Sequence, residues 1–313
     1  MATDTAFLYS AEYMTHDTGF GHPERPQRLA AIQEALAASG LDSTLKNMSP
    51  RRATVDDLAR VHRPDHIETI REMSAAGGGR LGYDTPLSAE SYDVALLSAG
   101  GVLAAVDAVV DGEAQHAFSC GRPPGHHATP TQAMGFCLFN SIAVAARYAQ
   151  REKGLARILI VDWDVHHGNG TQDAFYDDGD VFFFSIHQSP LYPGTGASAE
   201  RGIGAGEGST LNMPVAAGSV DADYIGIFEE TLIPVAREFS PDLVMISAGF
   251  DAHEDDPLAG VHITTDGFGR LTRLVRDIAE EQCEGRIVST LEGGYSLRGL
   301  SASVVAHLQA LAE

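Results

Sequence analysis

Short runs of apolar residues alternate along this chain with longer segments in which apolar residues recur at helical spacing. The short runs have the length and composition of buried strands and span residues 6–9, 116–119, 158–161, 181–184, 243–246 and 287–290. The longer segments indicate helices at residues 27–38, 92–110, 141–150, 222–238 and 267–281. Strands that alternate with helices predict a mostly parallel sheet flanked by helices, which is an α/β fold.

Polar or glycine-rich clusters directly follow five of the six predicted strands. They span residues 122–129, 162–172, 187–196, 249–260 and 292–296. In a parallel sheet the carboxyl ends of the strands meet at one edge, and ligands gather there. The five clusters are therefore predicted to form one site.

The composition is that of a soluble globular protein with a substantial core. The chain has 313 residues, of which 44% are hydrophobic and 20% charged, and no low-complexity linker divides it. We therefore expect a single domain over residues 1–313. The formal net charge of −22 argues against direct nucleic-acid binding and would attract a cationic or lysine-bearing partner, although solubility alone explains it equally well.

The cysteines and the apolar runs predict a cytoplasmic protein. Cys120, Cys137 and Cys283 are widely spaced and form no C-x-x-C pattern, which is typical of a reducing compartment and argues against a thiolate zinc site. No early segment has the pattern of a signal peptide, and no stretch of about 18 apolar residues indicates a membrane span.

The segment 162–170 is the most informative part of the chain, because two carboxylates and two imidazoles directly follow a predicted buried strand. Asp164 and His166 are two residues apart, so on an extended strand end both side chains point the same way. They make a natural pair of metal ligands. A hydrolytic metal site needs about three protein ligands, and Asp251 is the best candidate for the third, although by itself it could equally cap a loop.

Two adjacent histidines occupy a turn after another predicted strand. A single histidine there would more often be structural, but His126 and His127 beside a metal site indicate general acid and base chemistry. Asp162 and Asn169 are the obvious groups to orient the two imidazole rings.

The segment 292–295 follows the last predicted strand. Its glycines allow the backbone to approach a ligand closely, and Tyr295 could donate a hydrogen bond to a developing oxyanion. Gly-Gly-Tyr alone is more typical of a surface turn. Together with the histidines and the metal ligands, it completes an amide-hydrolysis site.

Six motifs follow one another along the chain: GHPERP at 21–26, RPPGHHA at 122–128, GFCLFNS at 135–141, DWDVHHGNGTQ at 162–172, SAGFDAHEDDP at 247–257 and LEGGY at 291–295. In these motifs the chain resembles the histone deacetylase family, most closely its class II branch and the bacterial deacetylase-like amidohydrolases. The resemblance implies the arginase/deacetylase fold, a three-layer α/β/α domain around a mostly parallel sheet of about eight strands.

The resemblance also implies roles for the catalytic residues. The zinc ligands of the family fall on Asp164, His166 and Asp251. His127 matches the general base and acid, and His126 matches the neighbour that orients the water. Asp162 resembles the partner of His126, whereas Asn169 stands where class I enzymes have the aspartate partner of His127, as in class II. Tyr295 matches the tyrosine that stabilises the transition state.

The family further implies a substrate channel and potassium sites. Phe136 and Tyr192 resemble the paired aromatics of the channel, with Gly135, Leu258 and Gly294 beside them, and Asp84 resembles the rim aspartate that binds the substrate backbone. The inner potassium site of the family matches Asp162, Asp164, His166, Ser185 and Ile186. A second site would lie near Phe175, Asp178 and Val181.

The expected function is therefore a deacetylase that removes an acyl group from the lysine side chain of a protein or peptide. Zinc would polarise the carbonyl and bind water, and iron(II) or cobalt(II) stays open because mixed carboxylate and histidine ligation suits several metals. Relatives include monomers, dimers and tetramers, so a homo-oligomer is also open.

Three alternatives compete with this expectation. An acetylpolyamine amidohydrolase would place an acid where this chain has Leu258, although Glu254 could reach in. An arginase-like ureohydrolase with two manganese ions would need an aspartate at Gly168, so one metal is expected and His253 is taken as a loop residue. A catalytically silent binding protein would lack one of the key residues, and none is missing.

Overall fold

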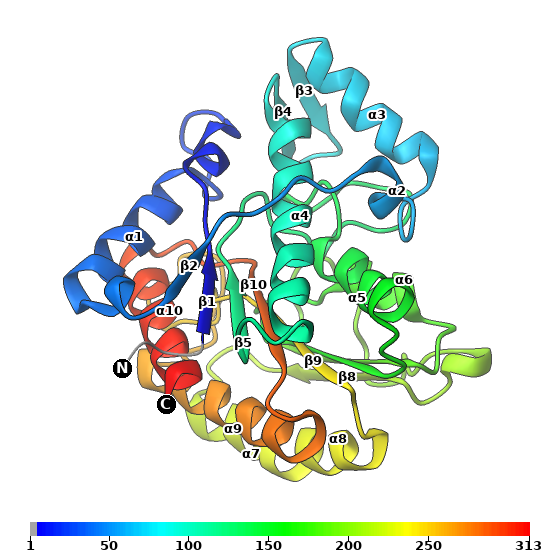
Figure 1. Ribbon diagram of the computed structural model, residues 1–313, viewed down its shortest axis with the longest axis vertical. Helices are drawn as coiled ribbons and strands as arrows, with labels where there is room; N and C mark the ends of the chain where they lie inside the picture. Colours follow the sequence, from blue (N-terminus) through cyan, green and yellow to red (C-terminus); the bar gives the residue numbers. More distant parts are fainter. Residues whose placement is uncertain (1–4) are drawn as a thin grey trace.

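The computed structural model describes residues 5–313 and contains one large sheet, one small hairpin and helices around them (Figure 1). The strands are β1 Thr5–Leu8, β2 Lys46–Met48, β3 Gly78–Leu81, β4 Thr85–Ser88, β5 His116–Ser119, β6 Ile158–Asp162, β7 Val181–Gln188, β8 Thr210–Val215, β9 Leu243–Ala248 and β10 Ile287–Leu291. The α-helices are α1 Gln27–Ser39, α2 Val55–Leu58, α3 Pro64–Ala75, α4 Ser91–Val110, α5 Ser141–Lys153, α6 Asn169–Phe175, α7 Asp221–Ile227, α8 Ile233–Phe239, α9 Thr265–Cys283 and α10 Leu297–Ala312. Short helices of other types are η1 Ala11–Thr15, η2 Leu41–Ser43, η3 Gly204–Gly206 and the π-helical turn η4 Phe228–Leu232.

The large sheet has eight strands in the order β2-β1-β5-β10-β9-β6-β7-β8, and every neighbouring pair is parallel. This confirms the predicted α/β fold with a parallel sheet of about eight strands. All six predicted strands belong to it. The two strands that the apolar runs did not predict, β2 and β8, lie at its edges, where one side of a strand has no neighbour.

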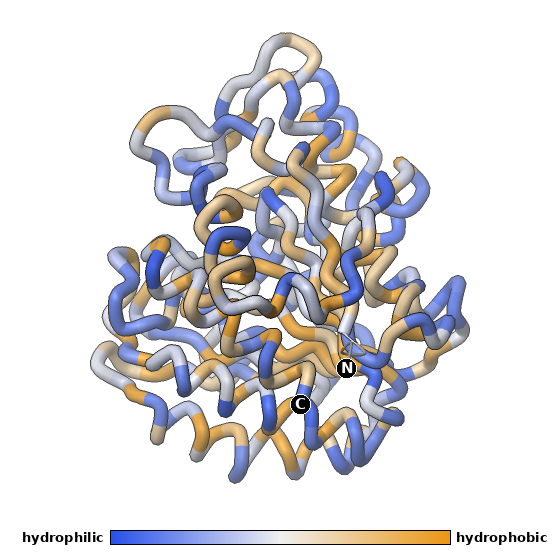
Figure 2. Tube along the Cα trace, turned by 60° about the vertical axis from the view of Figure 1, so that its left-hand side comes forward, coloured by the Kyte–Doolittle hydropathy of each residue, from blue (hydrophilic) through white to orange (hydrophobic). Residues whose placement is uncertain are grey.

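Helices cover both faces of the sheet, with α1, α9 and α10 on one side and α4, α5 and α6 on the other (Figure 1). Alternate side chains of a strand point to opposite faces. Leu159 and Val161 of β6 accordingly pack into the core under α9 and α10, whereas Ile158 and Ile160 pack under α4 and α5. Figure 2 shows the hydrophobic segments running through the middle of the molecule and the hydrophilic ones outside.

The five predicted polar clusters lie at the carboxyl edge of five adjacent strands. The strands β5, β10, β9, β6 and β7 are neighbours in that order, and each leads directly into one cluster or ends within it. Only the tertiary structure shows that these strands are neighbours, because their order in the sheet differs from their order along the chain. It brings segments that are more than 160 residues apart, such as 122–129 and 292–296, to one edge.

The predicted helices are confirmed with small changes at their ends. The helix predicted over 222–238 is a continuous run of α7, η4 and α8, in which one π-helical turn interrupts the α-helical hydrogen bonds. The sequence did not predict α3, α10 or the hairpin of β3 and β4. Helix α4 has the length and apolar composition of a membrane span, but 72% of its most apolar window is buried inside the protein, as in a core helix.

His307 of α10 ties three elements together within the core. Its Nδ1 lies 2.8 Å from the Thr272 hydroxyl of α9, and its Nε2 lies 2.9 Å from the Ser289 hydroxyl of β10. The ring also packs edge-on against Phe118 and Trp163. Burial lowers the pKa of His307 to about 3, so the folded protein holds this imidazole neutral.

We predict that His307 makes folding sensitive to acid. The unfolded chain takes up a proton near pH 6.5 and the folded chain does so only near the lowered pKa, so stability is full above pH 6.5 and is lost as the pH falls toward 3. The contribution of one such histidine falls by about 1.4 kcal/mol by pH 5.5. Urea unfolding at pH 7.5 and 5.5 should show a smaller acid loss in His307→Gln than in wild type. The exposed His262→Gln variant should match wild type, and equal acid losses in all three proteins would contradict the prediction.

Candidate active site

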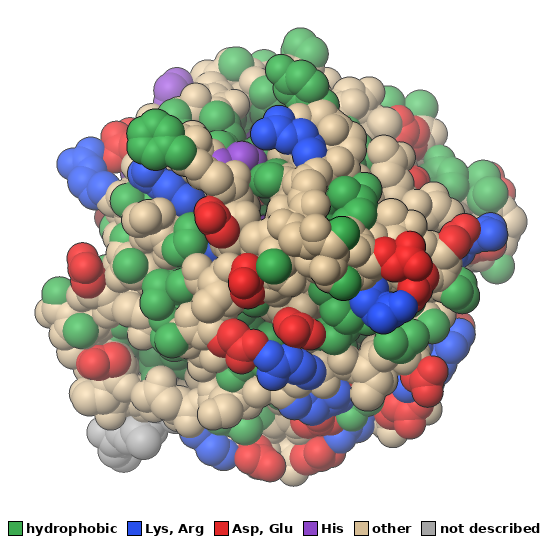
Figure 3. All heavy atoms as spheres, turned by 90° about the horizontal axis from the view of Figure 1, so that it is seen from above, with side chains coloured by type: hydrophobic (Ala, Val, Ile, Leu, Met, Phe, Trp, Pro, Cys, Tyr) green, Lys and Arg blue, Asp and Glu red, His purple; other side chains and the backbone are tan. Residues whose placement is uncertain are grey.

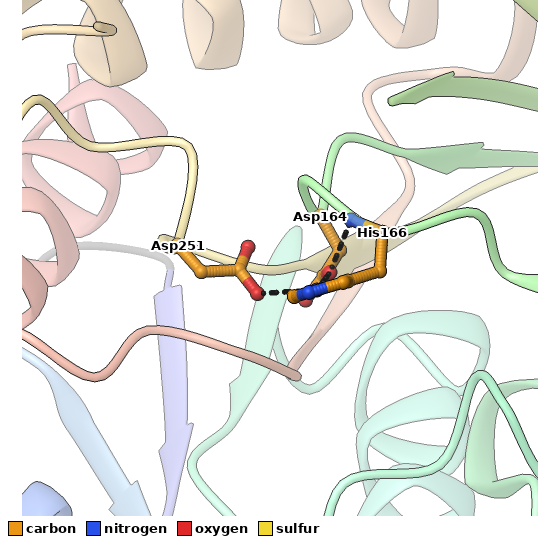
Figure 4. Close-up of side chains that lie close together, drawn as sticks. All are labelled: Asp164, His166 and Asp251. Atoms are coloured by element: carbon orange, nitrogen blue, oxygen red, sulfur yellow. Dashed lines mark hydrogen bonds and ion pairs between the residues drawn. The ribbon is translucent and has the colours of Figure 1, made fainter. Parts of the chain in front are cut away.

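Asp164, His166 and Asp251 converge at the carboxyl edge of the sheet (Figure 4). Asp164 and His166 follow β6, and Asp251 follows the adjacent strand β9. His166 Nδ1 lies 3.1 Å from Asp164 Oδ1 and 3.0 Å from Asp251 Oδ2. One potential ligand atom from each residue lies within 4.8 Å of the others, so the three predicted metal ligands face one centre.

Backbone amides hold the two carboxylates in place. The Gly293 amide donates to Asp164 Oδ2 at 2.8 Å, and the Val165 amide donates to Asp251 Oδ1 at 2.8 Å. Each carboxylate therefore keeps its other oxygen beside His166. A Cβ atom on Gly293 would lie 2.1 Å from Asp251 Oδ2, and one on Gly249 would lie 2.2 Å from Asp164 Oδ2, so only glycine permits this approach.

The charges of the three side chains favour a cation between them. Both carboxylates are fully buried and His166 is 9% exposed. Burial, together with the nearby Asp164, raises the pKa of Asp251 to about 7. Two buried carboxylates beside one imidazole leave negative charge that a cation would compensate. The ligand types and their convergence fit a divalent metal held by two carboxylates and one histidine.

His126 and His127 lie next to this centre, with their ring centroids 4.0 Å apart. His126 Nδ1 lies 2.9 Å from Asp162 Oδ2, and His127 Nδ1 lies 2.8 Å from Asn169 Oδ1. The structure thus brings each histidine to its predicted partner. Because the amide oxygen of Asn169 only accepts, Nδ1 of His127 carries the hydrogen, and Nε2 is left as the basic nitrogen.

The two histidines differ in proton affinity because their partners differ. Although burial opposes its charged form, Asp164 and Asp162 raise the pKa of His126 well above its usual value. Burial, together with His126 and His166, lowers the pKa of His127 well below its usual value. Neighbouring imidazoles with opposite shifts are typical of an acid–base site.

Gly168 leaves no space for a further carboxylate. A Cβ atom at this position would lie 2.1 Å from Asp162 Oδ2 and 3.2 Å from His126 Nδ1. Both ring nitrogens of His253 are also engaged, one 3.2 Å from the Thr265 hydroxyl and one accepting from the Asp255 amide at 3.0 Å. A two-metal site like that of an arginase would need a carboxylate at position 168, where this chain has glycine. The imidazole of His253 is bound to other groups.

A cavity of about 450 Å³ lies above the histidines. The predicted substrate residues that line it are Asp84, Gly135, Phe136, Tyr192 and Leu258, together with His127, His166 and Tyr295. The Tyr192 ring stands edge-on to His127 at 5.1 Å, and the Phe136 ring stands edge-on to Tyr295 at 5.9 Å. Phe136 and Tyr192 therefore both contribute to the wall of the cavity. A larger hollow of about 700 Å³ lies at the amino ends of β7 and β8 and contains none of the predicted site residues.

Gly294 directly precedes Tyr295, and its part in shaping the substrate channel stays a prediction. It is not among the residues that line the cavity within the described chain. Its φ of 123° turns the backbone, and a Cβ atom there would lie 2.8 Å from Leu300 Cδ1 and 3.2 Å from Phe250 Cβ. The glycine therefore permits close packing against Leu300 and Phe250 in the segment before Tyr295.

The wall at Phe136 depends on an unusual backbone turn. Gly135 and Phe136 both have positive φ values, 56° and 69°, and the second is uncommon for a residue with a side chain. A Cβ atom on Gly135 would lie 2.3 Å from His127 Cδ2. The Phe136 amide donates to the Thr85 hydroxyl at 3.2 Å. Strained backbone held by its surroundings is typical of functional sites.

The segment before Tyr295 is held by two residues whose roles could not be predicted from the sequence. Arg28 of α1 donates to the carbonyl oxygens of Gly294 at 2.7 Å and Glu292 at 2.5 Å. Asp256 accepts from the Tyr295 amide at 2.7 Å and, through its other oxygen, from the Leu258 amide at 3.0 Å. Both groups are buried, so they fix the position of Tyr295 at the cavity.

Glu292 joins the histidine turn to the tyrosine segment. Its carboxylate accepts from the amides of Gly125 at 2.6 Å and His126 at 3.1 Å, and from the Ser247 hydroxyl at 3.2 Å. Sequence reasoning named the motif that contains Glu292 but gave the residue no role. The available signal was a charged residue at the very end of an apolar strand, which is the same signal that identified Asp162.

The residues predicted to bind potassium lie on adjacent strands. Asp162 of β6 pairs in register with Ser185 of β7, and Ile186 follows it. At the proposed second site, Phe175 ends α6 and Val181 begins β7, while the Asp178 carboxylate pairs with Arg147. Potassium binding at both places stays a prediction.

Comparisons with known proteins find one family along most of the chain. Residues 22–311 match the model of the histone deacetylase domain. The chain is 40% identical to a probable deacetylase of Archaeoglobus fulgidus over 94% of this chain and 82% of the relative. It is 43% identical to the histone deacetylase-like amidohydrolase of Pseudomonas aeruginosa over 88% of this chain and 73% of the relative.

The fold also matches a solved structure described as the crystal structure of the HDA15 HD domain. The TM-score is 0.94 and the sequence identity 39%, over 98% of this chain and 88% of that chain.

We predict that the three converging residues bind one divalent metal ion per chain. Asp251→Ala removes one ligand and should abolish stable binding, because catalytic sites of this type use about three protein ligands. Asp255→Ala serves as the matched control, since its carboxylate pairs with the exposed Arg298 at 2.6 Å. Metal content after dialysis against zinc and gel filtration should be near one per chain in wild type and the control. Two ions per chain, or full content in Asp251→Ala, would contradict this site.

Proposed function

The chain belongs to the histone deacetylase family and is a deacetylase-type amidohydrolase, and from this premise we propose that it is zinc-dependent and removes acyl groups from lysine side chains of proteins or peptides. One observation carries the proposal. The converging ligands Asp164, His166 and Asp251 lie beside His127 and Tyr295 at a cavity with aromatic walls. Zinc, when bound, would supply the electrophile that polarises the acyl carbonyl and acidifies water.

His127 acts as the base and then as the acid. Asn169 holds the hydrogen on Nδ1, so Nε2 can take a proton from the attacking water. When the carbon–nitrogen bond of the amide breaks, the same nitrogen returns the proton to the leaving amine of lysine. The lowered pKa of His127 keeps the ring neutral before the reaction, which a base requires.

Tyr295 and His126 stabilise the charge that develops. Burial raises the pKa of Tyr295 well above its usual value, so its hydroxyl stays protonated and can donate to the oxyanion. Arg28 lies over the Tyr295 ring at 5.2 Å and helps to fix it. His126, held by Asp162, keeps positive charge close to the reacting group.

The cavity lining favours an acyl-lysine over an acylated polyamine. Its one carboxylate within the described chain is Asp84, near the outer loops. Leu258 lines the cavity where a polyamine enzyme would need an acid, and Glu254 lies in a separate pocket with Asp255 and Arg298. A second ammonium group beside Leu258 would therefore lack a partner, whereas the aliphatic stem of lysine suits the apolar lining that Phe136 and Tyr192 provide.

We also propose which ions the enzyme uses and where it is located in the cell. Iron(II) or cobalt(II) could replace zinc in such a ligand set. Potassium at Asp162 and Ser185 would offset the buried carboxylate of Asp162, whose pKa burial raises to about 6. We further propose a cytoplasmic location.

We predict that Tyr295→Phe lowers kcat on an acetyl-lysine peptide by about 100- to 1000-fold, the usual effect of removing an oxyanion donor. Tyr83→Phe deletes the same hydroxyl from an exposed residue at the same cavity and should retain wild-type activity. Purified, zinc-loaded protein would be assayed on acetyl-lysine peptides, longer acyl-lysine peptides and acetylputrescine. A preference for acetylputrescine of more than about tenfold would overturn the substrate assignment. Unchanged rates in both Tyr295→Phe and His127→Ala would overturn the mechanism.

We also predict a positioning role for Glu292. Gln at this position can still accept from the two amides of the histidine turn through its one oxygen, but it removes the negative charge beside His126, and its amide nitrogen cannot accept from the Ser247 hydroxyl. The expected result is a loss in kcat/KM of about 10- to 100-fold, as for groups that orient ligands, with wild-type metal content. The exposed Glu281→Gln, which weakens only a surface pair with Arg237, is the control. Wild-type kinetics in Glu292→Gln would exclude this role.

A further inference from the structure

Large hydrophobic side chains are exposed at eight described positions, and they are not spread evenly. The eight are Met14, Phe20, Val55, Tyr83, Tyr192, Ile203, Val220 and Leu258. Three of them, Tyr83, Tyr192 and Leu258, line the active-site cavity. Isolated exposed hydrophobic residues are ordinary on a protein surface, but a group around one opening indicates a binding surface.

Phe20 belongs to the same group through the contacts of its loop. The imidazole of His22 lies 3.4 Å from the carbonyl oxygen of Asp84, and its ring stands edge-on to Phe136 at 4.7 Å. The loop that carries Phe20 therefore lies between two residues that line the cavity. The Phe20 side chain itself is fully exposed, so its ring is available to something outside the protein.

Tyr83 stands on the neighbouring turn between β3 and β4 and is 92% exposed. The guanidinium of Arg80 donates to the Tyr83 carbonyl oxygen at 3.1 Å and supports this turn. Figure 3 views the molecule from the top of Figure 1, and hydrophobic side chains lie close to the histidine side chains visible on that face. Phe20, Tyr83 and Leu258 are called the apolar collar below.

We propose that the apolar collar binds a bulky apolar side chain adjacent to the acyl-lysine in a peptide substrate. This inference rests on the proposed function and deepens it. Tyr83 and Leu258 line the cavity, and the loop of Phe20 packs against residues of its wall. A peptide whose acyl-lysine enters this cavity would place its flanking residues against Phe20 and Tyr83. Burying an apolar side chain there would remove exposed aromatic surface from water. A small acylated amine has no flanking residue that it could place against Phe20 and Tyr83.

The test compares two acetyl-lysine peptides that differ only in the flanking residues, leucine on both sides or serine on both sides. Wild type should cleave the leucine peptide with a kcat/KM about tenfold higher, the effect of partly burying one leucine side chain. Phe20→Ser should reduce this ratio to about threefold or less, and Tyr83→Ser should reduce it similarly. Phe20→Ser should leave the hydrolysis of acetyl-lysine amide, which has no flanking residues, unchanged.

Ile203→Ser is the matched control, because Ile203 is 57% exposed but does not line the cavity. It should keep the wild-type ratio. The proposal would be overturned if wild type cleaved the leucine and serine peptides with nearly equal kcat/KM. It would also be overturned if both Phe20→Ser and Tyr83→Ser kept the wild-type ratio of the two kcat/KM values. A change in oligomeric state would also overturn the proposal. If wild type is a dimer, Phe20→Ser is a monomer and the peptide ratio is unchanged, then a second copy of the chain occupies the collar.

Failure of the proposed function has a different signature. If wild type cleaves neither the amide nor the peptides, the acyl-lysine assignment fails. The dissociation constants of the same two peptides then test whether the collar binds an apolar side chain. A tenfold higher affinity for the leucine peptide would support the proposal, and equal affinities would overturn it.

Discussion

Buried carboxylates impose the constraint on which this structure depends. Six of them lie around the carboxyl edge of the sheet with at most 8% exposure: Glu24, Asp162, Asp164, Asp251, Asp256 and Glu292. A buried carboxylate is costly unless hydrogen bonds or a cation compensate it. Each of the six meets this requirement through backbone amides, an imidazole, a hydroxyl or a guanidinium, and the loops of the site are shaped by those partners.

The partners come from segments that are distant in the chain, so the carboxylates also join the loops to one another. Glu292, after β10, holds the histidine turn after β5, and Asp164, after β6, accepts from the amide of Gly293. Glu24 pairs with Arg122 and Arg28, and Arg28 in turn holds Gly294. A defect in one loop would therefore displace the others. This mutual support is what keeps catalytic groups in one geometry.

Glycines make the close packing of these loops feasible. At positions 135, 168, 249 and 293 an added Cβ atom would lie within 2.3 Å of a catalytic or ligand side chain. The glycine at 168 also decides the chemistry, because a carboxylate there is what a second metal ion would need. The same absence of side chains that allows the site to close therefore agrees with the single metal ion that we propose.

The sequence by itself determined the fold class, the six central strands and the proposed catalytic residues that the fold brings together, because continuous apolar runs and the charged clusters after them are local signals. It missed β2 and β8, which lie at the sheet edges and lack a continuous apolar run. It also gave no role to Arg28, Asp256 or Glu292. Only the tertiary structure decided those roles, because the groups they bind lie in other segments. For the same reason only the fold showed that Tyr83 and Leu258 line one cavity and that the loop carrying Phe20 packs against residues of its wall, since these segments are far apart along the chain.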